Sequence, residues 1–325
     1  QCIRTIPISL HGVIQAQLDP ENGNQIMLFK DSGDILFVNW KDRVNSPVIK
    51  TGLISIDSFS EDVSSRTNSN ILTVITRDDE LFYVIMGKKN NSTKPSPHTR
   101  SIYLFNRGLN LAELLLEVKN SIKYAISTNK KKIAFVLASN EVALYDLSQK
   151  LLESVQFPFK TSITSVAVSN NSVIALGTSS GAIQILYAGL DLDESSKTRR
   201  PQRLLKWHID QVKSLQFTPD NSYLLSGGLE KVWVFWQLDT DKTKFLHRLN
   251  GSIEKVSIDT AKSDFYTLLL SMPVITSEDF ENTEYSDETE TNNEILVISA
   301  VDLASRLSVN GVSPKFAHAA IKASL

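Results

Sequence analysis

The sequence predicts an all-β fold of the β-propeller class, because short strands recur along nearly the whole chain at a regular spacing. Apolar and polar residues alternate with a period of two, which is typical of strands that bury one face. Groups of such strands recur about every 40 to 50 residues, which is the spacing of propeller blades. Segments with the amphipathic period of a helix are scarce.

The individual strands are rich in β-branched residues and are bounded by Asn, Asp, Ser and Gly. The clearest runs are residues 35–38, 71–75, 133–137 and 173–176. Two segments, Ala112–Lys119 and Phe316–Leu325, also fit a helical pattern. We interpret the first of these as an outer strand.

The clearest repeat runs from Leu204 to Leu249. It starts with Leu205–His208 and contains apolar runs at 212–217, 223–228, 231–236 and 244–249. Tight turns such as Thr218–Asn221 separate these runs. The repeat therefore predicts four antiparallel strands, which is one blade.

Four side chains of this repeat have the spacing of the WD40 family, which it resembles. His208 stands where that family has the histidine of a Gly-His pair, although Trp207 replaces the glycine. Ser226 precedes Trp236 as the family's serine precedes its tryptophan, and Glu230 stands where the family usually has Asp. The resemblance implies a structural hydrogen-bond relay of His208, Ser226, Glu230 and Trp236. The extra methylene of Glu predicts a distorted relay.

Weaker copies of this repeat account for most of the remaining chain and give about six blades in all. Gln1–Ile6 reads as the outer strand of a further blade, so we predict a seven-bladed propeller whose first blade is incomplete in this chain. The propeller is predicted to span residues 1–312. Residues 313–325 leave the blade pattern and are predicted to form a linker or the start of a following domain.

Composition limits the classes of partner. The chain has 325 residues, 42% of them hydrophobic, which is ample for a buried core. The formal net charge is −2, so the domain as a whole lacks the basic excess of nucleic-acid binders and any RNA contact needs a local patch. The single cysteine, Cys2, allows no intrachain disulfide, favours a reducing compartment and excludes a Cys-rich metal site. No apolar run is long enough for a membrane span.

No catalytic, cofactor-binding or metal-binding constellation is found in the sequence. The five histidines are scattered, and no pair has the spacing of a helical metal site. Phosphate-binding glycine motifs and the nucleophile elbow are missing. Trp207, Trp233 and Trp236 either pack between blades or form a stacking platform for bases. We favour packing, and expect Trp233 to be the more exposed of them because it shares a face with Phe235.

Two basic clusters are candidates for contacts with RNA or a partner protein. Their residues are Lys130, Lys131, Lys132, Lys197, Arg199 and Arg200. The first cluster lies in a turn between two strands, where it forms either a solvated hairpin tip or a contact for phosphate groups. An acidic segment, residues 277–293, has the opposite tendency and is predicted to be disordered or only partly ordered.

The repeat at Leu204–Leu249 and its continuation resemble one family more closely than generic WD repeats. The similarity lies in Leu205–His208, in Leu224–Val232 with Trp236, and in Phe245–Leu249 with Ile253–Glu254. These segments look like the nucleolar WD-repeat protein of the t-UTP (UTP-A) subcomplex. The strong similarity covers about 55 residues, and the rest fits as blades in the same order.

This resemblance implies a non-catalytic scaffold subunit of the small-subunit processome in the nucleolus. It implies a first propeller followed by a second one, and assembly with other propeller subunits of UTP-A on the 5′ external transcribed spacer of nascent pre-rRNA. It also implies support of 18S rRNA maturation and a link to RNA polymerase I transcription. No cofactor, membrane or small-molecule substrate is implied.

Two other classes of protein function stay open. An unrelated WD-repeat scaffold, such as a ubiquitin-ligase substrate receptor or a coat subunit, would bind through a peptide pocket without RNA. A propeller enzyme would need acids or histidines clustered at the central channel, and the sequence shows no such cluster.

Overall fold

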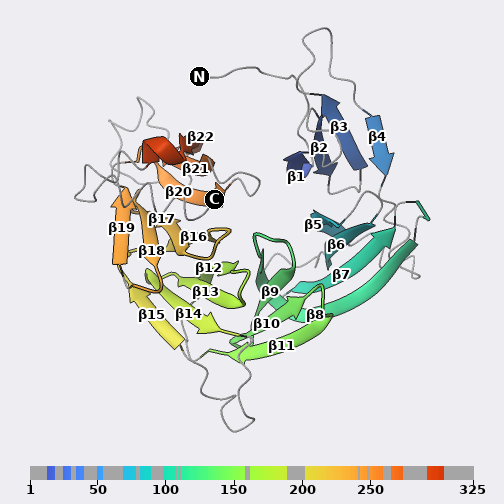
Figure 1. The fold of residues 1–325 in the computed structure, drawn as a ribbon, viewed down its shortest axis with the longest axis horizontal. Helices are drawn as coiled ribbons and strands as arrows, with labels where there is room; N and C mark the ends of the chain where they lie inside the picture. The colour runs from blue at the N-terminus through green and yellow to red at the C-terminus, as the bar shows by residue number, and fades with distance from the viewer. Residues whose placement is uncertain are drawn as a thin grey trace, which may run out of the picture. The chain divides into compact units, whose positions relative to one another are not determined.

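Two compact units make up the chain, Gln1–Ile122 and Lys123–Leu325. The computed structural model describes residues 13–18, 25–30, 34–39, 50–53, 69–77, 81–88, 98–106, 108–109, 111–157, 162–188, 202–240, 242–246, 249–258, 265–273 and 291–303. These residues are nearly all in strands, which confirms the all-β prediction (Figure 1).

The first unit begins with a four-stranded antiparallel sheet in the order β1-β2-β3-β4. Its strands are β1 (Val13–Leu18), β2 (Gln25–Lys30), β3 (Asp34–Asn39) and β4 (Lys50–Leu53). The strands β5 (Ser69–Thr76), β6 (Leu81–Lys88) and β7 (His98–Asn106) follow in the same antiparallel order. Met27 and Phe29 of β2 pack against Ile71, Val74 and Val84 in one buried cluster. The alternating apolar residues of these strands therefore form a core between two sheet faces.

Strand β8 (Leu111–Ile126) is unusually long, with 16 residues. It confirms the outer-strand interpretation of Ala112–Lys119 and excludes the helical one. Its first part pairs antiparallel with β7 from Leu111 to Ser121, with register shifts along the way. Its last part lies beside β9. One strand thus serves two consecutive groups of four strands.

The second unit contains β9–β11, which complete the seven-stranded sheet β5–β11, and three further sheets in sequential order. Its strands are β9 (Lys132–Leu137), β10 (Glu141–Asp146), β11 (Leu151–Gln156), β12 (Ile163–Val168), β13 (Val173–Thr178), β14 (Ala182–Tyr187), β15 (Gln202–Lys206), β16 (Val212–Phe217), β17 (Tyr223–Gly228), β18 (Trp233–Gln237), β19 (Lys242–Leu246), β20 (Ser252–Ile258), β21 (Phe265–Pro273) and β22 (Thr291–Ser299). Within the described ranges, the paired strands are antiparallel and are neighbours in sequence, as in a row of blades.

The cores of this unit lie between the faces of successive sheets. One cluster joins β13 and β14 to β16–β18 and contains Val212, Phe217 and Trp236. The next joins β17–β19 to β20–β22 and contains Trp233 and Tyr266. The sheet β16–β19 therefore buries both faces, which explains why its central strands β17 and β18 are buried along most of their length.

Several predictions concern residues outside the described ranges. They are the outer strand at Gln1–Ile6, the segment 313–325 and the second basic cluster of Lys197, Arg199 and Arg200. The acidic segment is described only at its end, where Thr291–Asn293 form the start of β22. These three residues pair with β21, so the segment is ordered at this end.

Candidate functional site

The predicted relay residues come together in the sheet β16–β19. His208 lies in the connection between β15 and β16, Ser226 lies on β17, Glu230 lies in the turn after β17, and Trp236 lies on β18. The strand register places Ser226 and Trp236 within one antiparallel pair of strands. His208, Ser226 and Trp236 are all buried. The strands thus carry Ser226 and Trp236, and the connecting loop and turn bring His208 and Glu230 next to them.

Hydrogen bonds connect these side chains in a row. Trp236 Nε1 donates to Ser226 Oγ at 2.7 Å, and Ser226 Oγ lies 2.7 Å from His208 Nε2. His208 Nδ1 lies 3.3 Å from Glu230 Oε2. The other carboxylate oxygen of Glu230 accepts the backbone N–H of Asp210 at 2.7 Å. The relay therefore ties the loop before β16 to the turn before β18.

The bonding pattern assigns the protons of the relay. The indole of Trp236 can only donate, and the carboxylate of Glu230 can only accept. A neutral His208 with its proton on Nδ1 donates to Glu230 and accepts the hydroxyl proton of Ser226 at Nε2, so every group has a partner. Burial lowers the pKa of His208, and the charge of Glu230 only partly offsets this effect. The imidazole is therefore held neutral near pH 7.

Two glycines allow the loop after His208 to lie close to neighbouring turns. A Cβ on Gly181 would lie 2.3 Å from the His208 carbonyl oxygen, and this residue has a φ of +79°. A Cβ on Gly228 would lie 2.2 Å from the Gln211 carbonyl oxygen. Gly181 belongs to the turn between β13 and β14 and Gly228 ends β17, so the loop is held between two successive blades.

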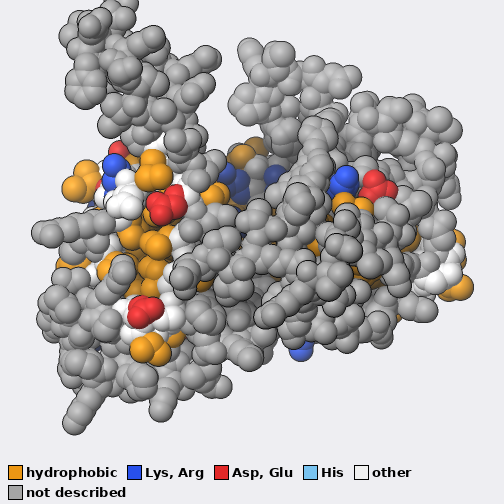
Figure 2. Space-filling view, turned by 90° about the horizontal axis from the view of Figure 1, so that it is seen from above, with side chains coloured by type: hydrophobic (Ala, Val, Ile, Leu, Met, Phe, Trp, Pro, Cys, Tyr) orange, Lys and Arg blue, Asp and Glu red, His pale blue; other side chains and the backbone are white. Residues whose placement is uncertain are grey.

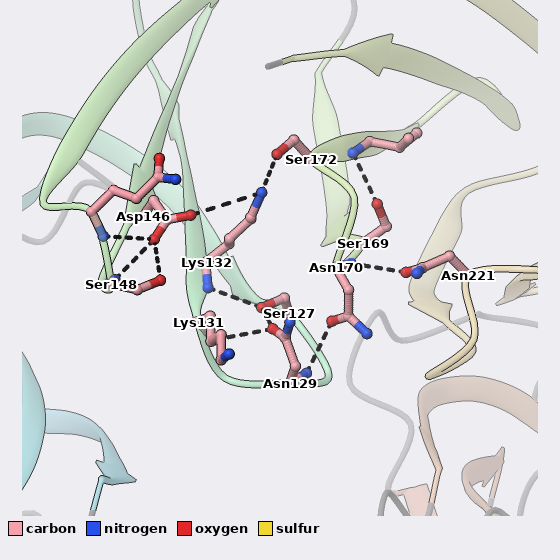
Figure 3. Close-up of polar contacts among 12 residues, drawn as sticks. Ser127, Asn129, Lys131, Lys132, Asp146, Ser148, Ser169, Asn170, Ser172 and Asn221 are labelled. Atoms are coloured by element: carbon pink, nitrogen blue, oxygen red, sulfur yellow. Dashed lines mark hydrogen bonds and ion pairs between the residues drawn. The ribbon is translucent and has the colours of Figure 1, made fainter. Parts of the chain in front are cut away.

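The structure places the three lysines of the first basic cluster in two different environments, a turn and a strand. Lys130 and Lys131 are exposed in the turn between β8 and β9, and Lys130 has a φ of 59°. Lys132 begins β9, opposite Asp146 in the strand register. Its Nζ lies 3.8 Å from Asp146 Oδ2 and also contacts the Ser172 hydroxyl (Figure 3). The three lysines therefore do not form one hairpin tip, because Lys132 is engaged within the fold.

The carboxyl of Asp146 is held ionised beside Lys132. Burial raises its pKa, but hydrogen bonds from Ser148 and Gln149 and the charge of Lys132 outweigh burial, so the pKa lies below its usual value. Lys132 thus pairs with a permanent negative charge near neutral pH.

A row of asparagines joins the turns of three successive blades, and our sequence analysis missed it (Figure 3). Asn170 Oδ1 accepts the backbone N–H of Asn129 at 3.0 Å. The backbone N–H of Asn170 donates to Asn221 Oδ1 at 2.8 Å, and its side-chain amide donates to the Pro219 carbonyl at 2.8 Å. These asparagines are 41 and 51 residues apart in the chain. Their recurrence near the blade period was the signal that could have revealed them.

The tryptophans serve packing. Trp233 is 0% exposed and contacts the rings of Phe235 and Tyr266 at centroid distances of 4.5 and 5.4 Å. The expectation that Trp233 is the more exposed tryptophan was wrong, because the face it shares with Phe235 is covered by the next sheet. Trp207 is half-buried and stacks on Phe245 at 5.6 Å. The described tryptophans of this blade therefore offer no open platform for bases.

The surface and the titratable groups give no sign of a reaction centre within the described ranges. No cluster of three or more His, Cys, Asp and Glu suited to a metal ion occurs there. Among the described side chains, those visible in Figure 2 are mainly hydrophobic, with some Lys, Arg, Asp and Glu beside them. None of the described helices has the length and apolar character of a membrane span.

Successive four-stranded antiparallel sheets and a relay of His, Ser, Trp and a carboxylate define a WD-repeat β-propeller. A family model described as the first β-propeller of WD repeat-containing protein 75 matches residues 1–269. The chain therefore belongs to this family, which confirms the propeller fold and the family resemblance that the sequence predicted.

Curated relatives agree with this assignment. The chain is 30% identical over 326 residues to NET1-associated nuclear protein 1 of Saccharomyces cerevisiae, with 91% of this chain and 32% of that protein covered. It is 26% identical over 304 residues to U3 small nucleolar RNA-associated protein 17 of Schizosaccharomyces pombe, covering 91% and 33%. WD repeat-containing protein 75 of Homo sapiens is 24% identical over 266 residues, covering 79% and 31%. The chain thus spans about a third of the length of these relatives.

Proposed function

We propose that this chain is a propeller of a non-catalytic scaffold subunit of the small-subunit processome in the nucleolus. In this role it helps to assemble the UTP-A subcomplex on the 5′ external transcribed spacer of nascent pre-rRNA. The assembly supports 18S rRNA maturation and is linked to RNA polymerase I transcription. Its partners are the other propeller subunits and the spacer RNA, which it contacts directly or through those subunits.

The observation that carries this proposal is the family match over residues 1–269. Two relatives that cover 91% of the chain support it, since their names refer to a nuclear protein and to association with U3 small nucleolar RNA. The structure fits a scaffold, because hydrogen bonds between successive blades hold the turns in place. Rigid blades that carry many exposed loops can hold several partners at once.

The exposed pair Lys130 and Lys131 is our candidate for a phosphate contact. Both side chains lie in a turn fixed by the bond from Lys130 N to Ser127 O, at 2.8 Å, and by the Asn129 side chain. A fixed basic turn can contact an RNA backbone without reading its sequence. Lys132 is left out of this candidate, because its charge is paired with Asp146.

In-cell crosslinking of the tagged full-length protein tests the proposal, with sequencing of the bound RNA and mass spectrometry of co-purifying proteins. We expect enrichment of the 5′ external transcribed spacer and of other propeller subunits. Recovery of ubiquitin-ligase or coat subunits without pre-rRNA would contradict the proposed function and leave an unrelated scaffold as the better account.

The variant Lys130→Glu/Lys131→Glu tests the phosphate contact in the same experiment. Reversing two charges should lower RNA crosslinking by about threefold or more, because phosphate contacts supply much of such affinity. The melting temperature should stay unchanged, since both side chains are exposed. Lys123→Glu/Lys150→Glu is the charge-matched control on the same blade. Equal RNA crosslinking by both variants would remove Lys130 and Lys131 from the proposal.

A further inference from the structure

The first part of β8 exposes an unusual number of leucines. Leu109, in the turn before the strand, is 69% exposed, and Leu111 and Leu114 are 64% and 50% exposed. The Asn106 side chain accepts the backbone N–H of Leu109 at 3.0 Å, which fixes this turn. Exposed apolar residues are ordinary when single, but a group of them marks an interaction surface.

This part of β8 is also the outer edge of its group of strands (Figure 1). From Leu111 to Val118 it pairs with β7. Strand β9 has six residues and follows the hairpin turn closed by Ser127 N and Lys132 O, so it lies beside the last residues of β8. Within the described ranges, the other backbone edge of Leu111–Val118 therefore faces no strand.

Two of the other outer strands protect their edges with lysines, whereas β11 exposes Leu151 and Leu152. Strand β19 carries Lys242 and Lys244, and β15 ends with Lys206. Lysines on an edge strand discourage pairing with another chain, because a second strand would have to cover their charges. The first part of β8 has leucines at its exposed positions instead. An open edge with apolar side chains is the surface that an added strand covers.

The charges beside the leucines are mainly negative. Glu113 and Glu117 are exposed, and Lys119 lies 4.0 Å from Glu117. This ion pair is solvent-exposed, with 76% of the Lys119 side chain accessible, so it contributes little binding energy of its own. The edge therefore suits a partner segment that brings both apolar side chains and a Lys or Arg.

We propose that the edge of β8 over Leu111–Val118 binds an extended segment of a partner protein, which adds to the sheet as a further strand. Leu109, Leu111 and Leu114 contact the apolar side chains of that segment, and Glu113 and Glu117 pair with its basic residue. This inference rests on the proposed function only in that the partner is a protein subunit of the same assembly.

A photo-crosslinking residue at Leu114 of the full-length protein tests this in cells. The matched control is the same residue at Leu152 of β11, a leucine of similar exposure, 45%, on another outer strand. We expect Leu114 to crosslink to one discrete segment of a propeller subunit, containing Lys or Arg, at least about fivefold more than Leu152 does. Crosslinks from Leu114 to RNA alone, to a second copy of this chain, or at the level of Leu152 would overturn the proposal.

A pair of double variants measures the contribution of the leucines. Leu111→Lys/Leu114→Lys should lower recovery of that subunit by about tenfold, whereas Leu151→Lys/Leu152→Lys on β11 should leave it unchanged. Both variants should keep the wild-type melting temperature, because all four leucines are exposed. Equal recovery with both variants would overturn the proposal. Failure of the wild-type protein to recover pre-rRNA would contradict the proposed function. The crosslink from Leu114 to a protein segment would still test, independently, whether the edge of β8 binds a partner strand.

Discussion

At the scale of single residues, the relay shows how polar groups are placed inside an apolar blade. Ser226 is 0% exposed, and its hydroxyl serves both Trp236 and His208. Each polar atom of the relay replaces its lost water with a protein partner, which is the condition for burying it without a large penalty. The relay therefore acts as a unit, and its members depend on one another.

Ser226→Ala should lower the free energy of unfolding by about 1 to 3 kcal/mol. The substitution leaves the Trp236 indole N–H and His208 Nε2 buried without their hydroxyl partner, and an unsatisfied buried group costs about that much. Denaturant unfolding of the purified propeller measures the change. Ser139→Ala, in an exposed turn of another blade, is the matched control. A Ser226→Ala protein as stable as this control would show that the relay adds nothing to stability.

Single residues also show which features could be predicted from the sequence and which could not. The relay was implied by the resemblance to the WD40 family, which rests on the spacing of His208, Ser226, Glu230 and Trp236. The exposure of Trp233 was predicted wrongly, because the burial of this side chain depends on the next sheet and not on its own strand. Lys132 appeared to belong to a basic turn, and only the strand register shows that it faces Asp146.

At the scale of elements, glycines decide how closely a loop can approach a turn. The loop His208–Gln211 lies against Gly181 of one sheet and Gly228 of the next. Backbone carbonyl groups occupy the space that a Cβ would need at both positions. The loop that carries the relay histidine is therefore positioned by backbone contacts as well as by side chains.

Gly228→Ala should destabilise the propeller by about 1 to 3 kcal/mol, because the backbone of Gln211 would have to move. Gly87→Ala is the matched control. Its Cβ would meet the end of the Leu72 side chain at 3.0 Å, and a side chain can give way. Thermal unfolding compares the two variants. Equal melting temperatures would contradict the idea that the loop is held by close backbone contact.

Elements were predictable to different degrees. Apolar runs and alternating apolar residues identified most strands, because a central strand buries both faces and an outer strand buries mainly one. Strand β8 was ambiguous, since the leucines at its exposed positions break the alternation that marks a strand. The asparagine row was missed, because single asparagines in turns look like ordinary turn residues and the bonds between blades appear only in three dimensions.

At the scale of the whole molecule, the family match identifies a WD-repeat β-propeller, and the scaffold role is our proposal from that match. The chain spans about a third of each of its curated relatives, so the proposed scaffold role concerns the full-length protein. Within this chain, the near-neutral charge agrees with binding mainly through protein contacts. In our two proposals, the basic turn would contact RNA and the apolar edge of β8 would bind protein, so the two partners would have separate places to bind.

The central claim is that the protein supports assembly of the small ribosomal subunit. Depletion of the full-length protein, followed by measurement of mature 18S rRNA relative to large-subunit rRNA, tests it most directly. The account predicts that 18S rRNA falls selectively, that precursors containing the 5′ external transcribed spacer accumulate, and that the wild-type gene restores both. An unchanged ratio of the two rRNAs after depletion would contradict the account.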